Sequence, residues 1–346
     1  MVRQTVGEPL RLGSYSELNG RNGFVVAPFT ITDEQPIWLI KADEVKVMGI
    51  DEIQVDDDCD ENNGAQTDTC CSEHSSIPSA EYARDFERFH DELVAGMFSK
   101  IVLGRSATHT FSHTINPLKL FKDACRSYPR LFIALTRLPS GEYWLTATPE
   151  ILLDGVGEKW RTIALAGTMQ LDKDNLEFDV PPAVDGKTVG DIRWSTKNIQ
   201  EQRYVASYIG ECLKQLDIDF EEEGPRTVRA ANLVHLRSDF TFTLYNSARV
   251  GSVLEVLHPT PAVCGLPKQT AHDFIVANEH APRDYYCGFM GALGEDTHLY
   301  VSLRCMRIRD NQCRLYAGGG LLKESVMEQE WMETEAKMQT MRRLLE

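Results

Sequence analysis

The sequence lacks an apolar stretch of the roughly 18 residues that a membrane-spanning helix requires. Its first residues, MVRQTVGEPLRLGSY, also lack the continuous apolar run of a signal peptide. Basic residues are in deficit, since 36 Lys and Arg stand against 52 Asp and Glu for a formal net charge of −16. Sequence-independent binding of nucleic acid needs clustered positive charge. We therefore predict a cytoplasmic protein that binds neither membrane nor nucleic acid.

Cysteine patterns that would indicate a disulfide framework or a zinc site are missing as well. The nine cysteines are odd in number and form no paired CxxC motif. We expect reduced thiols, most of them small core residues. The adjacent Cys70 and Cys71 lie in a polar stretch, where a metal or redox role is the alternative.

Regular alternation of strands with helices is absent, and mixed runs of both favour an α+β fold over a Rossmann-like sheet. One helix is expected to begin after the capping residue Ser79, because apolar side chains follow at helical spacing as far as Met97. The predicted helices cover residues 81–98, 117–126, 194–216 and 326–345. The predicted strands cover residues 23–31, 36–41, 100–111, 131–137, 142–148, 150–153, 160–166, 298–308 and 312–317.

Residues 51–79 divide the sequence, because this acidic stretch rich in Ser, Asn and Asp has almost nothing to bury. Such a composition predicts a flexible loop. We expect a β-rich N-terminal segment over residues 1–50, packed on a main domain over residues 80–346.

Several ionisable residues lie in apolar strand sequence. Lys100 in FSKIVLGR could act as a base if burial lowered its pKa, and Glu150 in TATPEILL could act as an acid if burial raised its pKa. His235 in NLVHLRSDF and Arg304 in VSLRCMRI have similar surroundings. For each of them alone, a structural role with a satisfied polar group is the alternative.

The C-terminal helix aligns two carboxylates and an ammonium. Glu330, Glu333 and Lys337 stand at i, i+3 and i+7 and share one face. Glu201, on another predicted helix, could add a further oxygen ligand, which is how proteins usually hold Mg²⁺. The alternative is a solvated face with a Glu–Lys pair.

The run LYAGGGLL places Gly318, Gly319 and Gly320 directly after a predicted strand. We expect a turn at the strand end, whose backbone N–H groups could face an anion. The run matches neither the phosphate-binding P-loop nor the dinucleotide-binding fingerprint.

Together these segments resemble the chorismate-utilising enzymes, a family that includes anthranilate synthase component I, aminodeoxychorismate synthase, isochorismate synthase and salicylate synthase. The resemblance runs from about residue 81 to the C-terminus, in the family's order, through KIVLGR, TATPEILL, ALAGT, STKNIQEQ, HLRSDF, HPTPAVCGLPK, RDYYCGFMGAL, VSLRCMRI, LYAGGG and EWMETEAK. It implies large antiparallel β-sheets packed together with helices on the outside, and a chorismate-binding catalytic domain over residues 80–346.

The resemblance also implies a ligand set, with chorismate as the substrate and Mg²⁺ bridging its ring carboxylate to acidic side chains. The metal-site carboxylates would be Glu201, Glu330 and Glu333, directly or through water. The substrate-binding residues would be Ala166, Gly167, Thr168, His235, Ala262, Arg304, Tyr316, Gly318, Gly319, Gly320 and Lys337.

Three positions resemble isochorismate synthases more than other members. Ammonia-using members carry glutamine where Lys100 stands, and aminodeoxychorismate synthases carry a nucleophilic lysine at the position of Ala166. Members that eliminate pyruvate commonly have threonine at the position of Ala262. The implied reaction is water attack at C2 of chorismate, with Lys100 as base and Glu150 protonating the departing C4 hydroxyl.

Two relatives in the family remain as alternatives: a salicylate synthase, and an inactive chorismate-binding protein. A generic Mg²⁺ hydrolase lacks support, because the sequence has no phosphate motif. We expect a monomer without a glutamine amidotransferase subunit. The sequence leaves open whether the product serves menaquinone, siderophore or salicylate biosynthesis.

Overall fold

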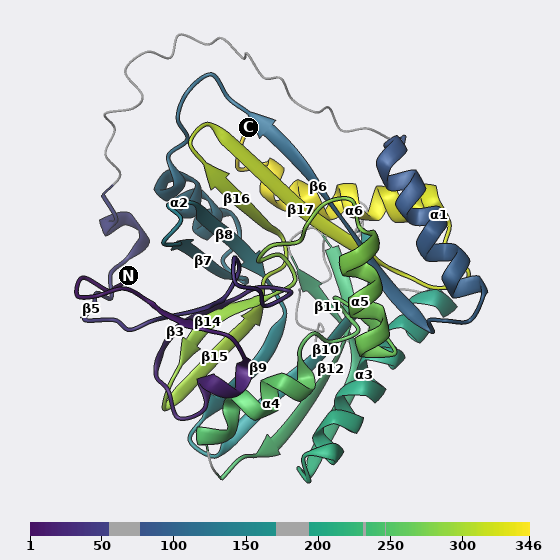
Figure 1. Cartoon of the computed structure of the whole chain (residues 1–346), viewed down its shortest axis with the longest axis horizontal. Coiled ribbons are helices and arrows are strands. Elements are labelled where there is room, and N and C mark those ends of the chain that lie inside the picture. Colours follow the sequence, from purple (N-terminus) through teal and green to yellow (C-terminus); the bar gives the residue numbers. More distant parts are fainter. Residues whose placement is uncertain (55–76, 171–193, 231–232, 246) are drawn as a thin grey trace, which may run out of the picture.

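The computed structural model describes residues 1–54, 77–170, 194–230, 233–245 and 247–346 (Figure 1). The helices in this part are α1 (Ala80–Val94), α2 (Pro117–Ser127), α3 (Thr196–Gln215), α4 (Val250–Leu257), α5 (Lys268–Asn278) and α6 (Met327–Arg342), with 3₁₀ turns η1 (Tyr15–Leu18), η2 (Ile50–Glu52) and η4 (Ser247–Arg249).

Two large antiparallel sheets form the centre of the molecule. The nine-stranded sheet has the order β11 (Phe220–Ala230), β12 (Leu233–Thr243), β10 (Lys159–Gln170), β9 (Ile151–Val156), β15 (Asp296–Val301), β14 (Phe289–Leu293), β3 (Gly23–Ala27), β4 (Ile37–Ile40) and β2 (Leu10–Leu12). The six-stranded sheet has the order β13 (Gly265–Leu266), β6 (Lys100–Thr110), β17 (Gln312–Leu321), β16 (Cys305–Arg309), β8 (Tyr143–Thr148) and β7 (Phe132–Arg137). A small ribbon pairs β1 (Val2–Arg3) with β5 (Glu44–Val45).

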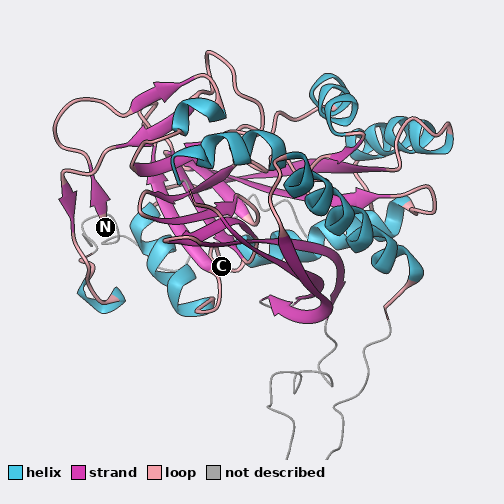
Figure 2. Cartoon of the chain, turned by 90° about the horizontal axis from the view of Figure 1, so that it is seen from below, coloured by secondary structure: helices cyan, strands magenta, loops and turns pink. Residues whose placement is uncertain are grey.

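Helices surround these sheets, as Figure 2 shows with the strands at the centre. Helix α3 packs on β10, while α6 and α1 pack on β17 and β6 respectively. The large hydrophobic core therefore spans both sheets and the inner faces of the helices. This arrangement confirms the predicted α+β fold of antiparallel sheets with outer helices.

Helix α1 begins as predicted but ends early. The Ser79 side chain accepts a hydrogen bond from the backbone N–H of Tyr82, which caps the first turn. The helix stops at Val94 because Gly96 adopts a left-handed conformation, with φ of 81°, and donates its N–H to Leu93 O. Met97 is therefore not part of the apolar face, and its side chain is exposed.

The single strand predicted over residues 298–308 is wrong. The chain leaves β15 in the nine-stranded sheet at Val301 and enters β16 in the six-stranded sheet at Cys305. Arg304 lies in this crossing with φ of 46°, a left-handed conformation that is uncommon for a residue with a side chain. The apolar sequence continues through the crossing because the whole crossing is buried or nearly so, and periodicity alone cannot mark such a break.

A second crossing runs beside the first one. The chain passes from β8 to β9 through Pro149 and Glu150, in the opposite direction, from the six-stranded to the nine-stranded sheet. Backbone hydrogen bonds join the crossings, from Ala147 N to Arg304 O at 3.1 Å and from Val301 N to Glu150 O at 3.0 Å. The fold thereby holds two ionisable residues at adjacent points between the sheets.

The N-terminal residues contribute strands to the nine-stranded sheet, since β3 pairs with both β4 and β14. The division into three segments stays a prediction, and most of the acidic stretch lies outside the described residues.

Of the six cysteines in the described part, all are free thiols and all but Cys125 are buried, so most of them are core residues, as expected. Cys59, Cys70 and Cys71 lie outside the described residues. Among the described helices, none has the length and apolarity to cross a membrane.

Candidate active site

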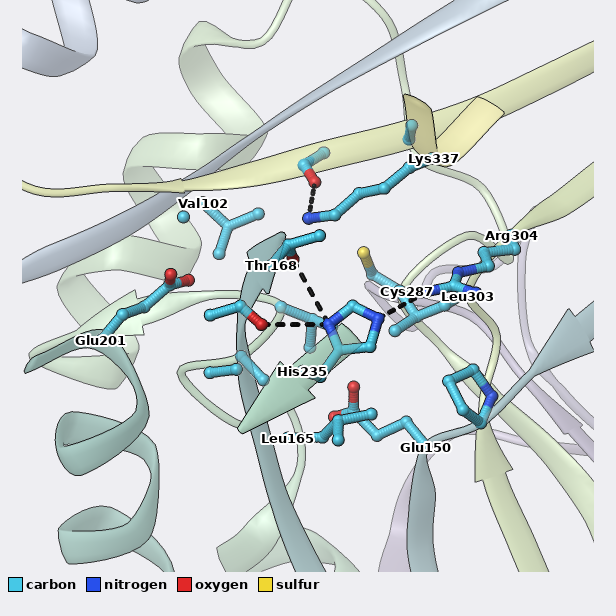
Figure 3. Close-up of a pocket in the computed structure, with 18 of the residues that line it drawn as sticks. Val102, Glu150, Leu165, Thr168, Glu201, His235, Cys287, Leu303, Arg304 and Lys337 are labelled. Atoms are coloured by element: carbon cyan, nitrogen blue, oxygen red, sulfur yellow. Dashed lines mark hydrogen bonds between the residues drawn. The ribbon is translucent and has the colours of Figure 1, made fainter. Parts of the chain in front are cut away.

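A cavity lies between the two sheets and collects most of the predicted site residues. Its empty volume is about 660 Å³, including its open mouth. The predicted residues that line it are Glu150, Ala166, Gly167, Thr168, Glu201, His235, Ala262, Arg304, Tyr316, Gly318, Gly320 and Lys337. They come from both sheets, from the two crossings, from helices α3 and α6, and, for Ala262, from the turn between α4 and β13. Figure 3 shows labelled members of this set converging from these different elements.

Four predicted residues are not part of the cavity lining: Lys100, Gly319, Glu330 and Glu333. The lining also includes residues that sequence reasoning missed, namely Val102, Pro149, Leu165, Val263, Tyr286, Cys287, Leu303 and Ala317. Most of these are apolar, and nothing in their sequence separates a cavity wall from an ordinary core position. Tyr286 and Cys287 stand within RDYYCGFMGAL, one of the segments that carry the family resemblance, so the sequence could have indicated both as site residues.

Glu150 provides a carboxyl group in the cavity that is neutral at ordinary pH. Its side chain is buried, and burial raises its pKa to about 8, although the positive charges of Lys100, Lys337 and Arg304 act in the opposite direction. A carboxylic acid with this pKa can donate a proton near neutral pH. The sequence-based expectation that burial would raise the pKa of Glu150 is therefore supported.

His235 in β12 forms a hydrogen-bonded chain with Arg304. Its Nδ1 lies 3.0 Å from Gly167 O, a pure acceptor, and its Nε2 lies 2.6 Å from Arg304 Nη2, a pure donor. The partners therefore assign the proton to Nδ1 and leave Nε2 as the acceptor. Burial, together with the charges of Arg304 and Lys337, holds the pKa of His235 well below its usual value. The imidazole is neutral and orients the guanidinium.

Arg304 is a buried cation at the cavity wall. Burial lowers the pKa of its guanidinium to about 10, so the group stays charged at neutral pH. The left-handed backbone at this residue is the kind of local strain found at functional sites. A buried, fixed guanidinium suits recognition of a carboxylate.

Glu201 in α3 and Lys100 at the start of β6 form a buried ion pair. Lys100 Nζ lies 3.1 Å from Glu201 Oε1, and the lysine side chain is fully buried. Burial acts to raise the pKa of Glu201, but Lys100, followed by other nearby lysines, outweighs burial and lowers it. Glu201 is thus ionised and lines the cavity, while Lys100 stands behind it.

The glycine run is part of strand β17, so the predicted turn is wrong. Gly318, Gly319 and Gly320 pair with residues 104, 103 and 102 of β6. Gly318 and Gly320 line the cavity, while Gly319 faces α6, where a Cβ would lie 3.2 Å from Glu330 Oε2. Because these glycines lack a side chain, the side chains of other elements can approach the strand closely.

Gly320 makes room for the Lys100–Glu201 pair. A Cβ at this position would overlap Glu201 Oε1 and would lie 2.8 Å from Lys100 Cε. Gly320→Ala is therefore expected to displace the pair and to lower kcat/KM by about 100-fold, the cost of a 1 Å misplacement in an active site. Gly13→Ala, at an exposed glycine where a Cβ would meet only Glu17 Oε1 at 3.5 Å, is the control and should leave kcat/KM unchanged. Equal steady-state parameters for the two variants would contradict this role.

Lys337 and Tyr316 also reach the cavity but already have partners. Lys337 Nζ donates to Gly318 O at 2.9 Å (Figure 3). It also lies 2.7 Å from Glu333 Oε1, the predicted i, i+4 pair. The Tyr316 hydroxyl donates to Asp284 Oδ2 at 3.1 Å. The predicted roles of both residues in binding a carboxylate stay predictions.

Lys197, a residue that sequence reasoning missed, contacts the buried carboxylate of Glu330. Burial alone would lower the pKa of the Lys197 ammonium, but nearby carboxylates outweigh burial and raise it. In order of their effect, these carboxylates are Glu330, Glu333 and Glu201. The sequence could have identified Lys197 as a site residue, because Lys197 and Glu201 stand at i and i+4 and share a helix face.

The chemistry of the predicted metal residues suits Mg²⁺. Carboxylate oxygens are its preferred ligands, and one or two of them suffice when water and substrate complete the shell. Glu330 Oε2 is buried and accepts no hydrogen bond within the described part of the chain. Among the described residues, no three His, Cys, Asp or Glu side chains stand together as a metal-binding group. Instead, each of the three predicted carboxylates contacts a lysine.

Comparison with known proteins identifies the class. The model of a family described as chorismate binding enzyme matches residues 22–346, and the chain belongs to this family. Isochorismate synthase DhbC of Bacillus subtilis is 28% identical over 280 residues, which are 78% of this chain and 69% of that protein. Isochorismate synthase EntC of Escherichia coli is 28% identical over 245 residues, 70% of this chain and 61% of that protein.

A solved structure shares the fold over nearly the whole chain. The crystal structure of DhbC from Bacillus anthracis matches with a TM-score of 0.78 at 23% identity, covering 99% of this chain and 92% of that one. With this identity the likeness shows the fold alone. The resemblance to the chorismate-utilising family drawn from ten short segments is confirmed.

Proposed function

We propose that the chain is an isochorismate synthase, which adds water at C2 of chorismate and expels the C4 hydroxyl. The observation that carries this proposal is Glu150, a buried carboxyl group in the cavity whose pKa is raised to about 8. Loss of a hydroxyl from C4 requires a proton donor, and Glu150 can supply that proton from its carboxyl group at neutral pH. The names of the relatives, isochorismate synthases DhbC and EntC, support the same reaction.

The remaining roles follow from charge and position. Arg304, oriented by His235, would bind a substrate carboxylate, and the Lys337 ammonium at the β17 edge would add positive charge. Lys100 would accept a proton from the attacking water on the Glu201 side of the cavity in its neutral amine form, which requires loss of the proton that pairs it with Glu201. Ala166 offers no nucleophile, so a covalent route through that position is excluded.

Glu201, Glu330 and Glu333 would hold Mg²⁺, and the buried Glu330 Oε2 is the best-supported ligand atom. When bound, the ion would neutralise the ring carboxylate of the substrate. We also propose a monomer in the cytoplasm that works without a glutamine amidotransferase subunit, since the reaction consumes water and not ammonia.

The direct test is turnover of chorismate with Mg²⁺, followed by chromatography of the products. We expect isochorismate without salicylate or pyruvate. Salicylate with pyruvate would identify a salicylate synthase instead, and anthranilate in the presence of ammonium salts would overturn the proposal. Calorimetric binding of chorismate without turnover would identify an inactive relative.

A further inference from the structure

Lys197 contacts one of the carboxylates to which the proposed function assigns a metal ion. Its ammonium, in the first turn of α3, contacts the Glu330 carboxylate in the first turn of α6. Glu333 on α6 and Glu201 on α3 act on the same ammonium. One lysine thus contacts one of the three carboxylates that the proposed function assigns to Mg²⁺ and interacts electrostatically with the other two.

Charge is balanced around these carboxylates without any metal. Glu201, Glu330 and Glu333 carry three negative charges when ionised, and Lys100, Lys197 and Lys337 carry three positive ones. Lys100 is fully buried and fixed, whereas the Lys197 side chain is 24% exposed at the cluster edge. A flexible four-carbon stem lets the Lys197 ammonium move into water.

We propose that Lys197 is an internal competitor for the metal: its ammonium neutralises the carboxylate cluster in the metal-free protein and must leave Glu330 before a divalent cation binds. This inference rests on the proposed function, because it assumes that the cluster holds a metal. The ammonium contacts Glu330 Oε1, and a divalent cation on the neighbouring Oε2 of the same carboxylate would lie close to that positive charge and be repelled by it. Only the small fraction of molecules in which Lys197 has moved away can bind the metal, and the apparent metal affinity is therefore lower than the affinity of that open state.

The test measures Mn²⁺ binding to the full chain without substrate, by the loss of the electron paramagnetic resonance signal of free Mn²⁺. Lys197→Met is expected to lower the Kd for Mn²⁺ by about tenfold or more, because the open state no longer has to be formed. Lys197→Arg keeps the charge and should bind as weakly as the wild type. Lys214→Met removes an exposed lysine from the same helix and is the matched control.

Thermal unfolding gives a second readout. Without metal, Lys197→Met leaves the buried Glu330 without its cation and should lower Tm. Added Mg²⁺ should then raise the Tm of this variant more than that of the wild type, because tighter binding stabilises the folded state more.

The outcomes separate the two proposals. Equal Mn²⁺ affinity in wild type and Lys197→Met, or weaker affinity in the variant, overturns the competitor role while the metal site stands. Absence of Mn²⁺ binding in wild type and variants overturns the metal site and this inference together.

Discussion

Glu150→Gln is expected to lower kcat for chorismate by about 10³-fold, within the usual range for loss of a general acid. Glutamine has the same shape and can occupy the crossing between β8 and β9, but it cannot donate the proton that the departing C4 hydroxyl needs. The wild-type rate should also fall as the pH rises above about 8, because Glu150 then loses its proton. Steady-state kinetics between pH 6 and about 9.5 measure both effects.

Stability measurements separate this chemical role from a structural one. The pKa of Glu150 is raised from 4.5 to about 8 on folding, so ionisation costs the folded state more than the unfolded chain. The penalty is absent below pH 4.5, grows as the pH rises and is complete above about 8. The variant should therefore match the wild type in urea unfolding at low pH and exceed its stability near pH 9.

The matched control is Glu158→Gln, which removes a carboxylate from an exposed turn between β9 and β10. It should retain wild-type kinetics. Near-wild-type turnover by Glu150→Gln, or a pH profile that does not fall above 8, would remove Glu150 from the role of proton donor.

Local sequence signals predicted most elements of the fold. The Ser79 cap, the apolar face of α1 and the alternating strands depend on neighbours in sequence, and the structure places them within a few residues of the predicted bounds. Sequence patterns separated the strands on either side of Pro149 but did not reveal the crossing between β15 and β16. That crossing is buried or nearly so, and its residues therefore resemble a continued strand that only the pairing partners divide.

The candidate site shows the same division between local and long-range information. Family resemblance identified most cavity residues, and a buried environment for Glu150 was predictable from its apolar neighbours. The position of Lys100 behind Glu201, and the contact of Lys197 with Glu330, depend on how helices α3 and α6 meet strands far away in sequence. A helical wheel of α3 alone places Lys197 and Glu201 together but cannot show that Glu330 faces them.

Lys100→Met is expected to lower kcat by a similar factor of about 10³, because the attacking water would lose its base. The substitution also removes the partner of Glu201, whose side chain is 10% exposed. Breaking a buried pair costs about 3 kcal/mol, so urea unfolding must establish that the variant is folded at the assay temperature. Lys159→Met, at an exposed strand end, controls for loss of a lysine.

A chemical rescue distinguishes a base from a purely electrostatic partner. Small primary amines that enter the cavity of Lys100→Met can replace a missing base. Below about pH 8, where Glu150 keeps its proton, their effect should grow with pH as the free amine becomes more abundant. A positive charge alone would be restored best at low pH, where the amine is protonated. Rescue that rises with pH therefore supports proton transfer by Lys100. Rescue that falls with pH would mean that Lys100 acts by holding Glu201 in place, and the base would then have to be another group at the cavity.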